Sequence, residues 1–200
     1  MVPGERELRP PRGGIEVGSL YYVRERPTNN VNQPANLERL CTINIARYGI
    51  VPKPPQPVSD IDLLSKLEVE GALSGLQTEI ASAGLTGSLN SYFEYKLTNV
   101  TRTDIDYVDA EKIFKERATR DDCLNWRGNI ERYNWAIYQV QSISVGDISF
   151  SRKREFGLSG NATAKLGVVE PKLKASIKNT TGAQFGGRGL VVTFTPIRRN

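Results

Sequence analysis

Asp104, Asp106 and Asp109 are the residues whose type and spacing come closest to a site for chemistry. Three carboxylates so close in the chain could hold a hard divalent cation and support metal-dependent catalysis. The residues that follow lack the glycine and the terminal glutamate of a calcium-binding loop. Asp109 also fits the N-cap of a helix, a role that needs no metal. A metal-dependent enzyme is therefore one alternative, but the sequence identifies no metal ligand.

The chain contains no histidine. This absence excludes Ser-His-Asp and Cys-His catalysis and zinc hydrolases with imidazole ligands. No phosphate-binding or dinucleotide-binding motif is present either. These exclusions favour a protein that is not an enzyme, and they indicate no cofactor.

Cys41 and Cys123 are the two cysteines of the chain. They would form a disulfide in an exported or periplasmic protein whose signal peptide had been trimmed, and they would be buried thiols in a cytoplasmic one. The N-terminal segment has no apolar signal-peptide core, and no apolar run is long enough for a transmembrane helix. The sequence leaves the compartment, and with it the disulfide, open.

Positive charge is concentrated near the C-terminus. The net charge of the chain is +5, but residues 151–200 carry ten basic and two acidic side chains, so residues 1–150 have a net charge of −3. Such asymmetry indicates an anionic partner for one end of the molecule. The candidate anion-binding residues are Arg152, Lys153, Arg154, Lys165, Lys172, Lys174, Lys178 and Arg188.

Residues 172–178 alternate lysine with apolar residues, which predicts a strand with Lys172, Lys174 and Lys178 on one face. Such a face could bind a lipid surface, a polysaccharide or an acidic protein. Nucleic acid is less favoured, because few aromatic residues accompany these lysines. The oligomeric state is left open.

The local patterns predict an α+β fold. Residues 1–14 are predicted to be a disordered basic arm, and residues 15–200 a single domain. Its mostly antiparallel sheet would have six to eight strands, with a helical segment at about 109–131 packed on one face. The predicted strands cover residues 15–25, 40–46, 89–99, 135–145, 148–156, 172–178 and 190–194.

Three further local predictions complete this arrangement. Gly146-Asp147 is predicted to be a hairpin turn, and residues 59–74 are assigned to a strand in preference to a short helix opened by Ser59 and Asp62. Residues 51–57, VPKPPQP, form a stiff extended connector, because proline removes the N–H donor and fixes φ. The helical segment would pack on the strands at 89–99 and 135–145 through Ile113, Phe114, Trp126 and Ile130.

From about Leu89 to Phe150 the predicted order is an amphipathic strand, a capped helix and a long strand that opens with Trp-Ala-Ile-Tyr-Gln-Val. A glycine-punctuated β region and a final apolar strand follow. In this order of elements the chain is similar in outline to the N-terminal pore-forming module of gasdermins, which also ends in β-rich, basic, lipid-facing segments. No sequence motif accompanies the similarity.

Three functions therefore compete. The first is a non-catalytic binding or assembly module whose basic C-terminal β-surface meets an anionic partner. The second is a membrane-active, pore-forming-like protein that binds anionic lipid, which is what the gasdermin resemblance implies. The third is the metal-dependent enzyme.

Overall fold

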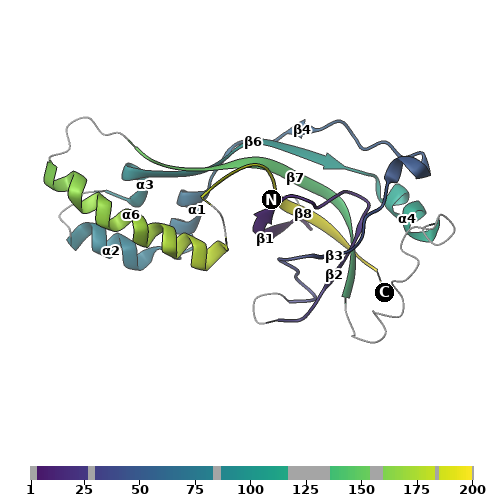
Figure 1. Ribbon diagram of the computed structural model, residues 1–200, viewed down its shortest axis with the longest axis horizontal. Helices are drawn as coiled ribbons and strands as arrows, with labels where there is room; N and C mark the ends of the chain where they lie inside the picture. Colours follow the sequence, from purple (N-terminus) through teal and green to yellow (C-terminus); the bar gives the residue numbers. More distant parts are fainter. Residues whose placement is uncertain are drawn as a thin grey trace. The chain divides into compact units, whose positions relative to one another are not determined.

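The computed structural model describes residues 4–26, 30–82, 87–116, 136–153, 160–182 and 185–199. It confirms the α+β class, with an eight-stranded antiparallel sheet and several helices packed against it (Figure 1). The strands are β1 Arg6–Arg12, β2 Leu20–Val23, β3 Glu38–Cys41, β4 Gln56–Pro57, β5 Ile61–Asp62, β6 Phe93–Asp104, β7 Ala136–Arg152 and β8 Gly186–Arg199. The helices are η1 Ile45–Tyr48, α1 Leu63–Val69, α2 Ser74–Ser82, α3 Leu89–Tyr92, α4 Tyr107–Glu116 and α6 Gly160–Thr181.

The sheet has the strand order β1-β8-β7-β2-β3, and β6 joins it by pairing with β7. The first residues of β7 pair antiparallel with β2, from Val23 opposite Ala136 to Leu20 opposite Gln139. The short strands β4 and β5 both pair antiparallel with β6. Strand β1 pairs antiparallel with β8.

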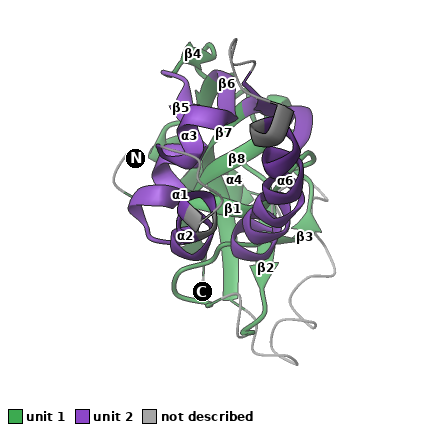
Figure 2. Cartoon of the chain, turned by 90° about the vertical axis from the view of Figure 1, so that its left-hand side faces the viewer, with its two compact units in different colours: residues 1–58, 101–145, 190–200 green, residues 59–100, 146–189 purple. Residues whose placement is uncertain are grey.

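The chain divides into two compact units (Figure 2). Unit 1 comprises residues 1–58, 101–145 and 190–200, and unit 2 comprises residues 59–100 and 146–189. Strands β6, β7 and β8 each contribute residues to both units. The prediction of a single domain over residues 15–200 stays a prediction.

Unit 1 has hydrophobic clusters on both faces of its sheet. Tyr21 and Tyr138 belong to one cluster, whereas their neighbours Leu20 and Ile137 belong to the other. Successive strand residues point to opposite faces, so this alternation buries both sides of β2 and β7. Helix α4 contributes Ile113, which is fully buried, to the second cluster.

Unit 2 buries apolar side chains from helices α1, α2, α3 and α6 and from the strand residues that they cover. In α6 the buried residues are Leu166, Val169, Leu173 and Ile177. Their spacings of three, four and four residues place them on one face of a helix. No helix in the described parts of the chain is both long and apolar enough to span a membrane.

The structure corrects several of the sequence predictions. Residues 6–12, assigned to a disordered arm, form β1 on the edge of the sheet. Residues 63–69, assigned to a strand, form α1, whose first turn is capped by the Asp62 carboxylate accepting from the Ser65 N–H at 3.0 Å. Gly146-Asp147 is not a turn, because β7 runs through it without interruption. Residues 172–178 lie in the middle of α6 and not in a strand.

The helix predicted at about 109–131 is confirmed as far as Glu116, and it begins at Tyr107, so Asp109 lies in its first turn. Trp126 and Ile130 lie outside the described residues. Ile113 packs with residues of unit 1 such as Ile137. The strand residues at 93–97, against which it was expected to pack, are buried in unit 2.

Candidate anion-binding surface

The basic residues of the C-terminal quarter do not form the predicted strand face. Helix geometry turns about 100° per residue, so Lys172 and Lys174 project about 160° apart around α6. Lys174 is half-buried, with its ammonium 2.7 Å from Glu170 Oε1 and 4.8 Å from the centre of the Phe150 ring. Lys172 and Lys178 are exposed. The helix therefore separates side chains that a strand would have gathered.

The remaining predicted residues of this set are also dispersed. Arg152 donates to the Thr163 carbonyl at 2.9 Å, and Lys153 donates to the Asn90 carbonyl at 2.6 Å. Lys165 is half-buried, Arg188 is exposed, and Arg154 lies outside the described residues. These contacts do not show whether the set binds anions, so the anion-binding role of these residues stays a prediction.

The charge asymmetry along the sequence does not carry over to the two units. Unit 1 holds 17 basic and 13 acidic residues, and unit 2 holds 10 and 9. The fold places the acidic segment 59–100 in the same unit as the basic segment 151–189, which reduces the net charge of unit 2 to +1. The larger positive charge, +4, belongs to unit 1.

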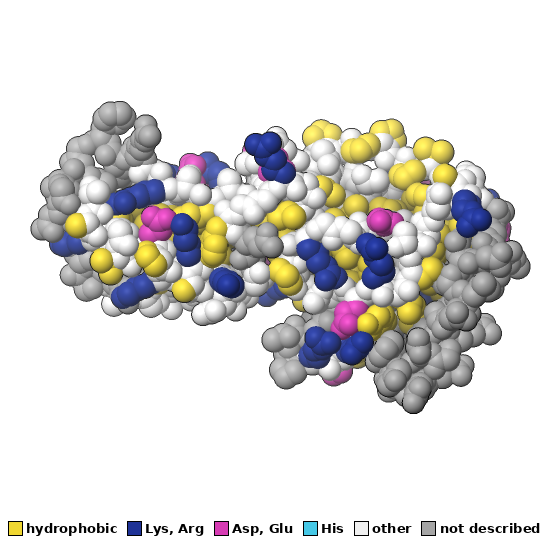
Figure 3. Space-filling model, in the orientation of Figure 1, with side chains coloured by type: hydrophobic (Ala, Val, Ile, Leu, Met, Phe, Trp, Pro, Cys, Tyr) yellow, Lys and Arg dark blue, Asp and Glu magenta, His cyan; other side chains and the backbone are white. Residues whose placement is uncertain are grey.

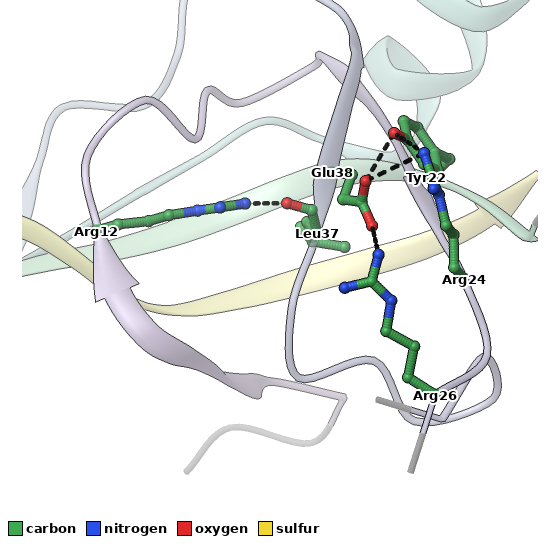
Figure 4. Close-up of polar contacts among 6 residues, drawn as sticks. All are labelled: Arg12, Tyr22, Arg24, Arg26, Leu37 and Glu38. Atoms are coloured by element: carbon green, nitrogen blue, oxygen red, sulfur yellow. Dashed lines mark hydrogen bonds and ion pairs between the residues drawn. The ribbon is translucent and has the colours of Figure 1, made fainter. Parts of the chain in front are cut away.

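Within unit 1, basic side chains gather where β1 ends and where β2 pairs with β3. We call this set the arginine cluster; it consists of Arg12, Arg24, Arg26 and Arg39. Arg24 and Arg26 share the Glu38 carboxylate, with nitrogen–oxygen distances of 3.5 Å and 3.0 Å (Figure 4). Glu38 also accepts a hydrogen bond from the Tyr22 hydroxyl at 2.7 Å.

The other two guanidinium groups of the cluster donate to main-chain carbonyls. Arg12 donates to the Leu37 carbonyl (Figure 4), and Arg39 donates to the Gly14 carbonyl at 2.8 Å. A carbonyl fixes the direction of a guanidinium group without cancelling its charge. The cluster thus holds four cations, of which two share the Glu38 carboxylate and two are bound to main-chain carbonyls.

Local structure explains why these side chains meet. Tyr22 and Glu38 are opposite residues in the antiparallel pair β2–β3, so their side chains lie on the same face. The Arg24 guanidinium lies 5.2 Å from the centre of the Tyr22 ring and donates to its hydroxyl at 2.9 Å. The half-buried tyrosine thereby orients the arginine side chain over the sheet.

The aspartate cluster does not assemble into a metal site. Lys53 lies 2.7 Å from an Asp106 oxygen and 3.4 Å from an Asp104 oxygen. Hydrogen bonds to Asp106 and then to Asp104 raise the pKa of Lys53, so the ammonium stays charged and bridges the two carboxylates. Among the described residues, no group of three or more histidine, cysteine, aspartate or glutamate side chains could hold a metal ion.

The disulfide between Cys41 and Cys123 stays a prediction. Cys41 lies at the end of β3 with a half-buried side chain, and Cys123 lies outside the described residues.

The sequence analysis missed the arginine cluster, although a signal was present. Five arginines occur between residues 6 and 26, but three of them fell in the assumed disordered arm, and Arg24 fell in the strand predicted at residues 15–25. Their grouping depends on a long-range contact between the end of β1 and the residue before β3, because Arg12 and Leu37 are 25 residues apart in the sequence. No local pattern encodes that contact.

No protein-family model matches the chain, and no curated protein matches it. Among solved structures, the chain is similar to a bacterial gasdermin from Bradyrhizobium tropiciagri, with 14% sequence identity and a TM-score of 0.41. The match covers 98% of this chain and 82% of that chain. A likeness of this size supports no statement about function.

Proposed function

We propose that this protein is a non-catalytic binding protein that docks on an anionic lipid surface through the arginine cluster. The observation that carries the proposal is the gathering of four guanidinium groups near β2 and β3, of which Arg24 and Arg26 share the Glu38 carboxylate and the other two donate to main-chain carbonyls. Guanidinium groups bind phosphate through two parallel hydrogen bonds, which suits lipid headgroups. Each basic residue near an anionic bilayer contributes about 1 kcal/mol, so several arginines together give substantial but salt-sensitive attraction.

A lipid surface fits the cluster better than a nucleic acid. Proteins that bind single strands combine basic grooves with exposed aromatic rings on which bases stack. In the described part of the cluster the aromatic side chain is Tyr22, which is half-buried and already faces Arg24. The arginines thus offer phosphate contacts without a stacking platform.

The lysines of α6 form a second candidate surface, smaller than the one predicted from sequence. The helix contains one acidic residue, Glu170, which pairs with Lys174, and four lysines: Lys165, Lys172, Lys174 and Lys178. Because they are divided around the helix, we expect them to contribute less than the arginine cluster.

A pair of charge-matched double variants tests the proposal. Arg26→Gln with Arg39→Gln removes two charges from the arginine cluster, and Lys172→Gln with Lys178→Gln removes two from α6. Loss of two basic contacts should weaken binding to phosphatidylglycerol-containing vesicles about thirtyfold for the arginine variant. The lysine variant should bind within about threefold of the parent protein. Co-sedimentation at low and high salt measures both.

Three outcomes would contradict the proposal. Equal binding by the two variants would show that the cluster is not the docking site, and a larger loss in the lysine variant would move the site to α6. Retention on heparin without binding to anionic vesicles would show a soluble polyanion to be the partner. Dye release from vesicles, measured in the same samples, distinguishes a membrane-active protein from one that only docks.

A further inference from the structure

Glu38 contacts the arginine cluster with both of its carboxylate oxygens. Oε1 lies 3.0 Å from an Arg26 nitrogen, whereas Oε2 lies 3.5 Å from an Arg24 nitrogen and accepts from the Tyr22 hydroxyl at 2.7 Å. Figure 4 shows the carboxylate between the two guanidinium groups. In Figure 3, basic side chains lie beside acidic ones on the part of unit 1 that carries β2 and β3. The point at which two arginines of the cluster converge is therefore filled by a residue of the chain itself.

A carboxylate at this point has the same chemistry as the headgroup phosphate that would bind there. Guanidinium groups bind carboxylate and phosphate through the same forked set of N–H donors. Glu38 uses one oxygen for each of the two arginines. A phosphate that binds Arg24 and Arg26 has to share these cations with Glu38, and the two negative charges repel each other at such short range. The two anions therefore compete for the same arginines.

The exposure of these side chains allows Glu38 to be displaced. The side chains of Arg24, Arg26 and Glu38 are 42%, 52% and 31% exposed. An ion pair between exposed groups contributes little to stability because water screens it, whereas a buried pair is costly to open. Glu38 can therefore leave the arginines while the backbone pairing of β2 with β3 stays in place.

Three of the four arginines have contacts that do not depend on Glu38. The Arg24 guanidinium lies over the Tyr22 ring and donates to its hydroxyl at 2.9 Å. Arg12 and Arg39 donate to main-chain carbonyls. These contacts remain when the Glu38 carboxylate moves away. Glu38 is thus not needed to orient most of the cluster, and its main effect is to reduce the positive charge that the cluster presents.

We propose that Glu38 is an internal competitor of the lipid headgroup and limits the affinity of the arginine cluster for anionic membranes. This inference rests on the proposed function. A headgroup has to replace Glu38 before it binds Arg24 and Arg26 fully, and a surface with little anionic lipid provides little attraction for this exchange. Glu38 thereby raises the density of anionic lipid that the protein needs for binding.

A pair of charge-matched single variants tests the competition. Glu38→Gln removes the negative charge but keeps an oxygen that can accept from Arg26. It should raise partitioning onto phosphatidylcholine vesicles containing phosphatidylglycerol about fivefold at low salt. Glu94→Gln is the control, because Glu94 belongs to unit 2, is 36% exposed and pairs with Lys96 at 2.9 Å. It adds the same unit of charge and should change partitioning less than about twofold. Co-sedimentation over a series of phosphatidylglycerol fractions measures both.

A change of background shows whether the gain comes from the arginines. In a variant with Arg24→Gln and Arg26→Gln, Glu38 has lost both of its cationic partners in the cluster, so Glu38→Gln should raise partitioning less than about twofold. The gain in the parent background should also shrink at high salt, because the groups involved are exposed. Each variant should keep the urea midpoint of its background, since it removes only exposed ion pairs.

Several results would overturn the inference while docking by the arginine cluster stands. Weaker binding by E38Q would show that Glu38 positions the arginines, and equal gains for E38Q and E94Q would trace the effect to net charge. A gain that persists without Arg24 and Arg26 would locate it elsewhere. If neither the parent protein nor E38Q binds anionic vesicles, docking falls and the inference falls with it. Binding by E38Q alone would support both.

Discussion

An Arg199→Ala variant should have a free energy of unfolding about 2–3 kcal/mol below that of the parent protein. Arg199 is almost fully buried near the C-terminus, and its Nε and Nη2 donate to Gln139 Oε1 at 3.0 Å and 2.6 Å. Its Nη1 contacts Glu111, and its guanidinium carbon lies 4.8 Å from the centre of the Phe114 ring. Removing it leaves the oxygen of the fully buried Gln139 without these two donors. Urea denaturation measures the difference.

The adjacent arginine supplies the control. Arg198 is exposed and donates to Asn32 at 2.8 Å, so Arg198→Ala should change the free energy of unfolding by less than about 0.5 kcal/mol. Equal losses for the two variants would contradict the role assigned to Arg199.

The contact between Arg199 and Glu111 predicts that the free energy of unfolding depends on pH. The hydrogen bond from Arg199 lowers the pKa of Glu111. A lowered pKa in the folded state stabilises the protein above the ordinary glutamate pKa, and this contribution is lost as the pH falls through the lowered value. The stability difference between the parent protein and Arg199→Ala should therefore shrink in acid, and a difference that grows below pH 4 would contradict this account.

The amphipathic strands were the part of the fold most accessible from sequence. In β6, Phe93, Tyr95 and Leu97 are buried, as their alternation with polar residues predicts. The alternation succeeds because one face of that strand is covered and the other is not. Leu89, assigned to the same strand, is also buried, but in the short helix α3. A period-2 pattern cannot locate the residue at which a strand begins.

Residues 172–178 show how the same reasoning fails. Leu173 and Ile177 are compatible with both a strand and a helix, and only Val169 and Leu166, one and two turns earlier, establish the helical period. Pro171 obscured that continuity, since proline ordinarily ends a helix. Because of this error, the predicted anion-binding surface placed Lys172, Lys174 and Lys178 on one face. A strand gathers alternate lysines on one face, whereas a helix separates them.

The continuity of β7 and the role of Asp147 also depend on contacts that sequence does not display. Asn99 has a φ of 53°, and its side chain donates to Asp147 at 2.9 Å. The Gly189 N–H donates to the other oxygen of Asp147, also at 2.9 Å. The pair Gly146-Asp147 resembles a hairpin turn, but here the glycine admits Leu97, whose Cδ1 would lie 2.8 Å from an added Cβ. Gly146 therefore permits a close approach between β7 and Leu97, and the chain does not reverse direction there.

Among the described glycines with a positive φ, Gly18 is the one whose substitution should lower the free energy of unfolding most. Its φ is 82°, and an added Cβ would lie 2.4 Å from Ile45 Cγ2 and 3.2 Å from Ile113 Cδ1. Its N–H donates to the Val140 carbonyl at 2.7 Å, and its carbonyl accepts from Gln139 at 3.1 Å, so the backbone cannot shift without losing these bonds. A methyl group at this position therefore meets both backbone strain and steric overlap.

Gly18→Ala should accordingly lower the free energy of unfolding by about 3 kcal/mol, of which about 1–2 comes from the left-handed backbone and the rest from overlap. Gly49→Ala separates the two causes, because Gly49 has a φ of 70° with no atom within 4 Å of the added Cβ. It should lose only about 1 kcal/mol. Ile45→Ala removes the clashing methyl, so it should cost less in the Gly18→Ala background than in the parent protein. Additive losses in this double-mutant cycle would show that Ile45 does not constrain Gly18, and the steric part of the argument would fail.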